Sequence, residues 1–168
     1  MRLGLSQDQQ QALRSGPDVM PPPTGAPTTK EIPYDYVARF VLTGTPSTRL
    51  QDVINISIEG AFVAVSIGYS VILPKKDQNT GSIPSIDFKY SIIDSGSGRE
   101  LQNRPIHNIA GLGDATGRRP FRPLAKPMLF MPRSTIRIEV EEITNDITKD
   151  AELFIVFHGY KMLGYGMG

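Results

Sequence analysis

The sequence predicts an all-β fold, an antiparallel β-sandwich or jelly-roll-like domain with an extended amino-terminal arm. The chain of 168 residues contains 16 glycines and 14 prolines, which favours many turns and short elements. Several segments alternate between apolar and polar residues, as half-buried strands do. No segment keeps a helical periodicity over several turns, and about six strands joined by turns indicate two packed sheets.

The run LFIVFHGY at residues 153–160 is expected to be the central strand. It is rich in β-branched and aromatic residues, and it is too short and too close to glycines for a helix. Both of its faces are largely apolar, so one should lie in the core and the other against a second sheet, a covering segment or another subunit. The first face carries Leu153, Ile155 and Phe157, and the second carries Phe154, Val156, His158 and Tyr160.

Five other segments are expected strands, because apolar residues dominate them or alternate along them. In the second of them, Ile54, Ile56 and Ile58 should point inward. The last should pair with the central strand as an antiparallel hairpin, through a turn at Asn145 and Asp146. The five segments cover residues 36–42, 54–59, 62–73, 86–92 and 135–141. In the third, Val63, Val65, Ile67, Tyr69 and Val71 should share one face, and Ala64, Ser66, Gly68 and Ser70 the other.

Two segments lack strand patterns. Residues 1–33 are expected to form an arm, and residues 34–168 the sandwich domain. Six prolines between 17 and 33 predict an extended, polyproline-like conformation, which leaves two alternatives, a disordered tail or an arm that docks on a neighbouring subunit. Residues 99–133 are predicted to be a long irregular segment, and a loop of this length is usually functional or bound to something.

Composition excludes several classes of function. A net charge of +1 provides no strong field for nucleic acid or an anionic membrane. The absence of cysteine excludes disulfides and thiolate chemistry. No apolar run approaches the ~20 residues of a membrane-spanning helix, and no secretion signal is expected.

Catalytic and metal-binding patterns are also missing. Neither His107 nor His158 has a second histidine or a carboxylate at ligand spacing, and His158 is expected to be a hydrogen-bonded buried or interface histidine. The glycine-rich residues 111–118 lack the Gly-Lys-Ser/Thr ending of a phosphate loop. The glutamates within 139–142 could bind Ca²⁺, but a solvated face is expected. The sequence therefore predicts no enzyme, cofactor or metal.

A basic segment with interleaved aromatic residues favours a protein interface over a nucleic-acid site. Residues 118–133 contain five basic residues and no acidic one. Arginine, methionine and aromatic residues are enriched at protein interfaces, whereas the chain as a whole lacks the charge and the motifs of a nucleic-acid-binding protein. The expected interface residues are Pro21, Pro22, Pro23, Arg118, Arg119, Phe121, Arg122, Phe130, Met131, Arg133, Phe154, Val156, His158 and Tyr160.

Three segments together resemble small virion structural proteins of tailed bacteriophages. They are ISIEGAFVA at residues 56–64, FRPLAKPMLFMPRSTIRI at 121–138 and AELFIVFHGYK at 151–161. The resemblance lies in a pattern of strands and prolines and contains no catalytic signature. It implies a β-sandwich building block of the virion without enzymatic activity.

The resemblance leaves the place in the particle open, and the first hypothesis is the capsid, where a decoration or cement protein stabilises the head by bridging capsid subunits. Its partners would be the major capsid protein or other virion proteins and further copies of itself in a closed symmetric oligomer, assembled in the cytoplasm of the bacterial host. No membrane and no specific nucleic acid would be bound. Two alternatives remain open, a neck, tail or baseplate component and a host- or carbohydrate-binding module. The absence of tryptophan weakens the second.

Overall fold

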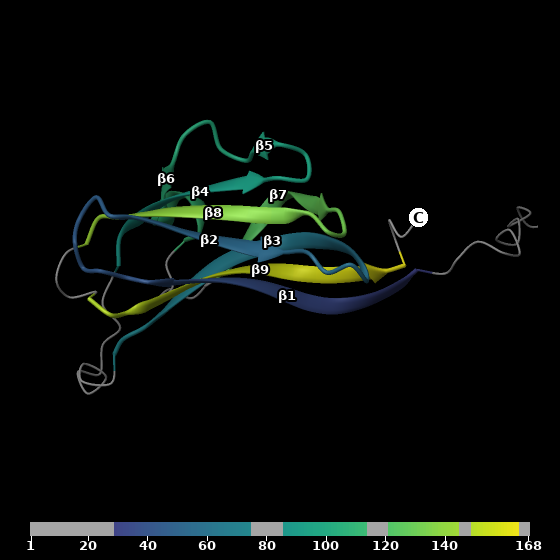
Figure 1. The fold of residues 1–168 in the computed structure, drawn as a ribbon, viewed down its shortest axis with the longest axis horizontal. Coiled ribbons are helices and arrows are strands. Elements are labelled where there is room, and N and C mark those ends of the chain that lie inside the picture. Colours follow the sequence, from purple (N-terminus) through teal and green to yellow (C-terminus); the bar gives the residue numbers. More distant parts are fainter. Residues whose placement is uncertain (1–28, 75–85, 114–120, 145–148, 165–168) are drawn as a thin grey trace, which may run out of the picture.

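The computed structural model describes residues 29–74, 86–113, 121–144 and 149–164, and these form two antiparallel sheets (Figure 1). The all-β sandwich predicted from the sequence is thereby confirmed. The first sheet has the order β1 (Lys30–Val41), β9 (Glu152–Leu163), β3 (Gly60–Ile72) and β7 (Phe121–Phe130). The second has the order β2 (Arg49–Asn55), β8 (Thr135–Glu142), β4 (Phe88–Asp94) and β5 (Arg99–Glu100), with β6 (Ile106–His107) also on β4 and one short helix, α2 (Asn108–Gly111).

The strand pairs are nested. β1 pairs with β9, β2 with β8, β3 with β7, and β4 with both β5 and β6. The chain thus resembles one long hairpin that folds back near β4 and is then rolled, which brings β3 beside β9 and β4 beside β8. This nesting, with the two arms of the hairpin alternating between sheets, makes the sandwich jelly-roll-like.

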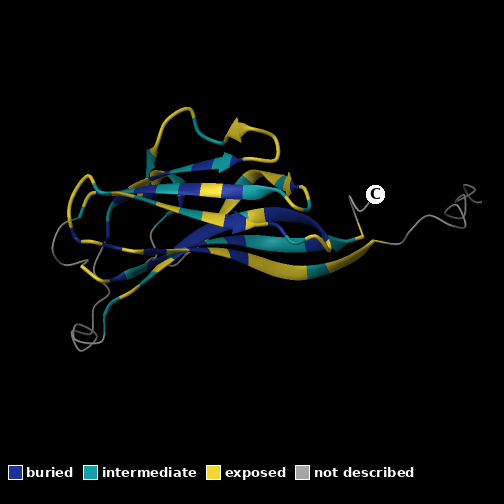
Figure 2. Ribbon diagram, viewed as in Figure 1, coloured by how far each residue is buried: buried dark blue, intermediate teal, exposed yellow. Residues whose placement is uncertain are grey.

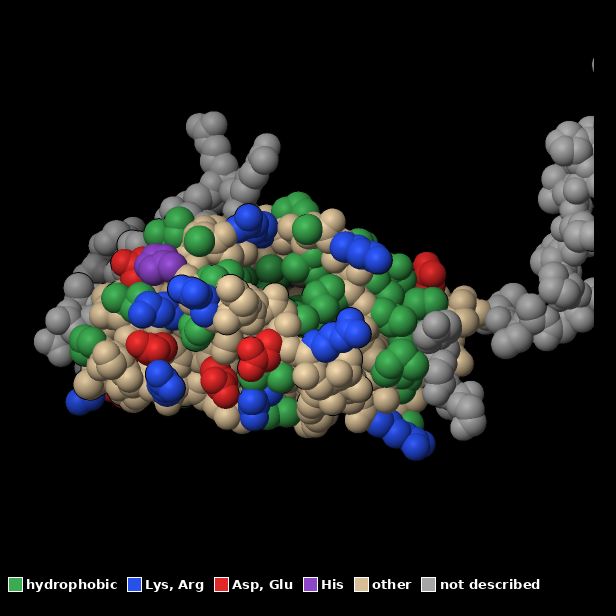
Figure 3. Space-filling view, turned by 90° about the horizontal axis from the view of Figure 1, so that it is seen from above, with side chains coloured by type: hydrophobic (Ala, Val, Ile, Leu, Met, Phe, Trp, Pro, Cys, Tyr) green, Lys and Arg blue, Asp and Glu red, His purple; other side chains and the backbone are tan. Residues whose placement is uncertain are grey.

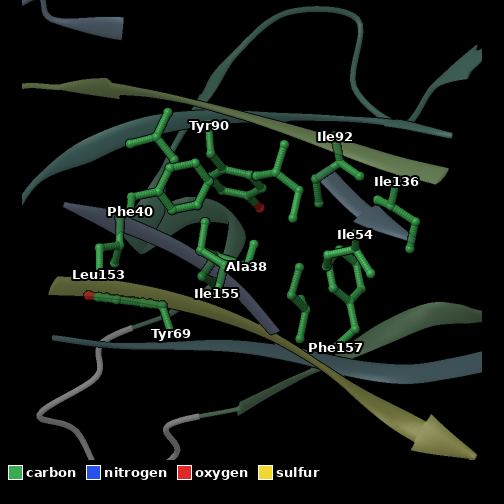
Figure 4. Packing of buried hydrophobic residues seen from close by; sticks show 14 of the residues in the cluster. Ala38, Phe40, Ile54, Tyr69, Tyr90, Ile92, Ile136, Leu153, Ile155 and Phe157 are labelled. Atoms are coloured by element: carbon green, nitrogen blue, oxygen red, sulfur yellow. The ribbon is translucent and has the colours of Figure 1, made fainter. Parts of the chain in front are cut away.

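The core lies between the two sheets, where both contribute aromatic and branched aliphatic side chains (Figure 4). Phe62 stacks on Phe130 at 6.3 Å between ring centroids, and Phe157 meets Phe130 edge-on at 6.2 Å. Each large side chain buried in this way contributes about 1.5–3 kcal/mol relative to exposure. The largest fully buried side chains include Leu42, Phe88, Leu112, Ile136, Ile138, Leu153 and Ile155.

β9 is an inner strand of its sheet, as its sequence predicted. It lies between β1 and β3 and pairs with both along its whole length. Its inward residues Leu153, Ile155 and Phe157 are fully buried. Figure 2 shows buried and intermediate positions along β9, whereas β1 beside it alternates with exposed positions.

A β-bulge changes the faces of β3. The register of β3 against both β9 and β7 shifts between Ala64 and Ser66, so Val65 is an extra residue and is 38% exposed. Ala64 therefore lies in the core and Val63 on the outer side, and the expected single face from Val63 to Val71 is wrong. A bulge inverts the alternation, because it adds one residue to a pattern with a period of two.

The prediction for Ile58 is also wrong. Ile54 and Ile56 are buried, but Ile58 is 53% exposed. β2 ends at Asn55, and Ile56 is held instead by the β7–β8 turn, through its N–H on the Ser134 carbonyl at 2.9 Å. Ile58 lies in the turn that leads into β3, where the alternation of a strand no longer applies.

β8 and β9 do not form the expected hairpin, because they belong to different sheets. β8 lies between β2 and β4, so both of its edges are already paired. The chain crosses to the first sheet at Asp150, whose N–H donates to the Leu42 carbonyl, while the Leu42 N–H donates to the Ala151 carbonyl. Ala151 is fully buried at this crossing. The expected turn at residues 145 and 146 lies outside the described residues.

The segment 99–133, predicted to be irregular, contains β5, β6, α2 and the ten-residue strand β7. Pro123 and Pro127 lie within β7 and obscure its pattern in the sequence. Proline lacks an N–H to donate, so it is tolerated in a strand that has one unpaired edge. β7 is such an edge strand, because in the described structure it pairs with β3 alone.

The first strand extends into the segment assigned to the arm. β1 begins at Lys30, which pairs with Leu163, and Pro33 pairs with Tyr160. Four residues before the expected boundary at Tyr34 thus belong to the sheet. Residues 1–28 lie outside the described part of the chain.

Candidate interaction surface

The side of the first sheet that faces away from the core carries four cross-strand rows, here called the outer surface. Register places the members of each row side by side on neighbouring strands. One row is Val37, Val156, Gly68 and Phe121, and the next is Asp35, His158, Ser66 and Pro123. The flanking rows are Arg39, Phe154 and Ser70 on one side, and Pro33, Tyr160, Val63 and Leu129 on the other.

Apolar side chains dominate the outer surface and are incompletely covered. Val37 is 49% exposed, Phe121 47% and Leu129 44%, while Phe154 and Val156 are half-buried. Isolated exposed apolar residues are ordinary, but a contiguous group of them on one sheet marks an interaction site. The small residues of β3, Ser66, Gly68 and Ser70, lie between β9 and β7 and leave room for larger side chains of those two strands to approach each other.

One polar pair lies near the centre of this surface. A hydrogen bond of 2.9 Å joins the His158 Nδ1 and Asp35 Oδ1 atoms. The Phe121 ring meets the imidazole edge-on at 4.1 Å between centroids. The His158 Nε2 atom is buried and has no hydrogen-bond partner among the described residues. His158 is therefore a hydrogen-bonded surface histidine held by its neighbours on β1 and β7.

The charges at the margin of the outer surface are also paired. Arg39 on β1 forms an ion pair with Glu152 on β9. The hydrogen bond and the negative charge of Glu152 raise the pKa of the Arg39 guanidinium above its ordinary value.

The corresponding side of the second sheet is different, because charged residues cover it. Glu141 lies 3.7 Å from Arg49 and 3.9 Å from Lys89, and Arg137 lies 3.5 Å from Glu139. Figure 3 shows basic and acidic side chains scattered over the side of the molecule that bears β4 and β5. A hollow of about 70 Å³ lies there, lined by residues that include Lys89 and Glu139. The two sides of the sandwich thus differ in polarity.

The structure brings five of the predicted interface residues together on the outer surface. They are Phe121, Phe154, Val156, His158 and Tyr160. Met131 is 45% exposed in the turn after β7, and Arg133 lies in the same turn with φ +64°. Pro21, Pro22, Pro23, Arg118 and Arg119 lie outside the described residues.

Two predicted interface residues have internal roles. Phe130 is fully buried between Phe62 and Phe157, so it belongs to the core and not to the surface. Arg122 donates a hydrogen bond to the Ala110 carbonyl and so fastens β7 to α2. Alternation along the edge strand β7 turns Phe130 inward and Leu129 outward, and this strand was not predicted from the sequence.

Sequence reasoning missed Val37, Val41, Ile72 and Leu129, which are 44–50% exposed on the outer side of the first sheet. The alternation of β1 contained a usable signal. Tyr36, Ala38 and Phe40 point inward, so Val37 and Val41 point outward. No comparable signal marks Leu129, since the prolines hide the strand that carries it.

Polar groups elsewhere have structural partners. Glu142 points inward and accepts hydrogen bonds from the Thr43 N–H, the Thr43 hydroxyl and the Gly44 N–H, which fixes the loop after β1. It does not share a carboxylate cluster with Glu139 and Glu141. Among the residues that the structure describes, no group of three or more His, Asp or Glu side chains could hold a metal ion, and no helix could cross a membrane.

Comparisons with known proteins give little. No family model matches the chain, and no curated protein matches its sequence. Among solved structures, the chain is similar to one of Desmodium yellow mottle tymovirus, with a TM-score of 0.28 and 12% sequence identity over 89% of this chain and 95% of that one. A likeness this weak carries no argument, so the function has to be inferred from the surface itself.

Proposed function

We propose that this chain is a structural protein of a virion that assembles through the outer surface of its first sheet. The observation that supports the proposal is the unequal polarity of the two sides of the sandwich. Charged pairs cover the second sheet, whereas Val37, Phe121 and Leu129 leave the first sheet apolar and exposed. A protein with such a side gains free energy when another subunit covers it, at about 25 cal/mol per Å² of apolar area.

The finer proposal is a capsid decoration or cement protein of a tailed bacteriophage, present in many symmetric copies and without enzymatic activity. Residues 56–64, 121–138 and 151–161 support the phage part of this proposal, because they resemble small virion structural proteins of tailed bacteriophages. Most of these residues lie on β3, β7, β8 and β9. Three of those strands, β3, β7 and β9, belong to the four-stranded first sheet. The segments that carry the resemblance therefore include most of the proposed assembly surface.

A particle-binding experiment tests the outer surface. Val37 and Val53 are matched positions, because both are exposed valines on the outer sides of edge strands, β1 in the first sheet and β2 in the second. Val37→Asp should weaken binding to particles that lack this chain by tenfold or more, because a carboxylate would be buried in an apolar contact. Val53→Asp should bind as the unchanged protein does. Equal binding by the two variants would remove the outer surface from the mechanism.

Copy number separates the capsid from the neck, tail or baseplate. A decoration protein repeats over the whole shell, whereas a connector component is present only in the copies that make up one ring. Densitometry of purified particles, with the major capsid protein as internal standard, measures the ratio. A ratio near that of one ring would replace the capsid proposal with the neck or tail alternative. Absence of the chain from purified particles would reject a virion role altogether.

A further inference from the structure

The outer surface lies beside the point where residues 1–28 join the fold. Lys30 begins β1 and pairs with Leu163 at one tip of the first sheet (Figure 1). The chain before it holds 28 residues outside the described part. Because an extended chain spans about 3.1–3.3 Å per residue, thirteen residues equal the length of the twelve-residue strand β9. Residues 1–28 are therefore long enough to cross the whole outer surface.

The composition of residues 1–28 complements that surface. They contain two arginines and two aspartates, so their net charge is zero, and Arg39 and Glu152 at the margin of the outer surface form an ion pair. They also contain five prolines. Proline-rich segments bind aromatic surfaces with little loss of conformational entropy, because proline restricts the chain before binding. Phe121, Phe154 and Tyr160 provide aromatic side chains in three of the four rows.

We infer that residues 1–28 of a second copy of this chain cover the outer surface, so that neighbouring subunits exchange their amino-terminal segments. The inference rests on the proposed function, since it names the occupant of the same assembly surface. It makes the oligomer a product of this chain alone. A separate capsid protein would then contact other parts of the molecule.

The direction of β1 favours a second copy over the segment's own subunit. β1 runs from its tip at Lys30 inward along β9, so a segment that continued the line of β1 backward would leave the sheet. To cover its own sheet, the segment would have to reverse direction within the few residues before Lys30. A segment that continues straight on leaves its own sandwich and can reach the next one.

A cysteine cross-linking experiment tests the exchange, and the chain contains no cysteine to interfere. One full-length variant carries Met20→Cys in the segment, and a second carries Val37→Cys on the outer surface. The two purified proteins are mixed under reducing conditions and then oxidised, and the products are resolved by mass. Val53→Cys replaces Val37→Cys as the control, since it presents an equally exposed cysteine on the second sheet.

The expected result is a disulfide-linked heterodimer of Met20→Cys with Val37→Cys, at least fivefold more abundant than that with Val53→Cys. Equal yields with the two partners would overturn the inference. A double variant, Met20→Cys with Val37→Cys in one chain, tests the other occupant. Predominant cross-linking within single chains would show that each segment covers its own sheet and would also overturn the exchange. Both failures are read on purified protein, so the particle-binding and copy-number results would still decide the virion role separately.

Discussion

Gly159 of β9 lies opposite Ala64 of β3, at the residue where the register between the two strands shifts. A Cβ atom on Gly159 would lie 1.8 Å from the Val63 carbonyl oxygen, so no larger residue fits without moving the backbone. The close approach allows the bulge that turns Ala64 into the core and Val63 outward. Which side chains of β3 face outward thus depends on Gly159 in the neighbouring strand β9.

Gly159→Ala should therefore destabilise the fold by about 2 kcal/mol or more, because the added methyl group overlaps backbone atoms in the middle of the sheet. Urea unfolding monitored by circular dichroism measures the change. Gly98→Asn is the control. Gly98 has φ +66° with nothing within 4 Å of an added Cβ, and asparagine tolerates that conformation at a cost of a few tenths of a kcal/mol. Similar losses in the two variants would contradict the role given to Gly159.

Asn108 should be the most sensitive buried polar residue. It donates to the Tyr69 hydroxyl at 3.0 Å and to the Ile86 carbonyl at 2.9 Å, and accepts from the Phe88 N–H at 3.1 Å. Asn108→Ala should cost about 2–4 kcal/mol, because it leaves buried backbone groups unpaired. Tyr69→Phe removes one of these hydrogen bonds and should cost about 1 kcal/mol. Thermal unfolding of both variants gives the comparison, and an equal or smaller loss in Asn108→Ala would refute it.

Truncation of Ile56 should destabilise the fold far more than truncation of Ile58, although both are isoleucines of the same alternating segment. Ile56 is 3% exposed and Ile58 is 53% exposed. Ile56→Ala should lower the free energy of unfolding by about 2–4 kcal/mol through lost burial and a cavity. Ile58→Ala should change it by less than about 0.5 kcal/mol. The midpoints of denaturant unfolding, compared at equal m-values, measure both changes. A large loss in Ile58→Ala would show that its side chain lies in the core.

Tyr90 should make stability fall at alkaline pH. Burial raises the pKa of its phenol from 10.0 to about 12, against a smaller opposing effect of the Arg122 charge. Between about pH 10 and 12 the unfolded phenol loses its proton while the folded one retains it. Stability therefore decreases as pH rises through this range. Tyr90→Phe lacks the phenol that titrates. From pH 9 to pH 11 the free energy of unfolding of the unchanged protein should therefore fall by more than that of Tyr90→Phe. A constant difference would contradict the prediction.

Removal of residues 1–28 should leave the sandwich intact, because β1 begins at Lys30. In samples dilute enough to be monomeric, where no second copy covers the outer surface, the expected shift in Tm is below about 2 °C. Removal of residues 1–33 also deletes the pairs from Lys30–Leu163 to Pro33–Tyr160 and should lower Tm further. Calorimetry of the two truncated chains tests where the arm ends. Equal Tm values would place the boundary at Tyr34, as the sequence suggested.

Local patterns predicted the parts of the fold that local physics controls. The apolar character of residues 153–160 on both faces indicated an inner strand, and β9 is one because few positions in a sandwich tolerate two apolar faces. The alternation of residues 135–141 placed Ile136, Ile138 and Val140 inward, where they are buried. Four residues of the outer surface, Phe154, Val156, His158 and Tyr160, followed from the same rule.

Other features depended on contacts between distant segments, which no local pattern contains. The sequence by itself determined an all-β chain with an apolar central strand, because alternation and β-branching are properties of neighbouring residues. Only the tertiary structure decided that β8 and β9 part into different sheets, that β7 is a strand despite two prolines, and that a bulge at Val65 inverts β3. Each of these features depends on which strand pairs with which and in what register. That pairing joins segments far apart in the sequence and is decided only when the whole chain folds.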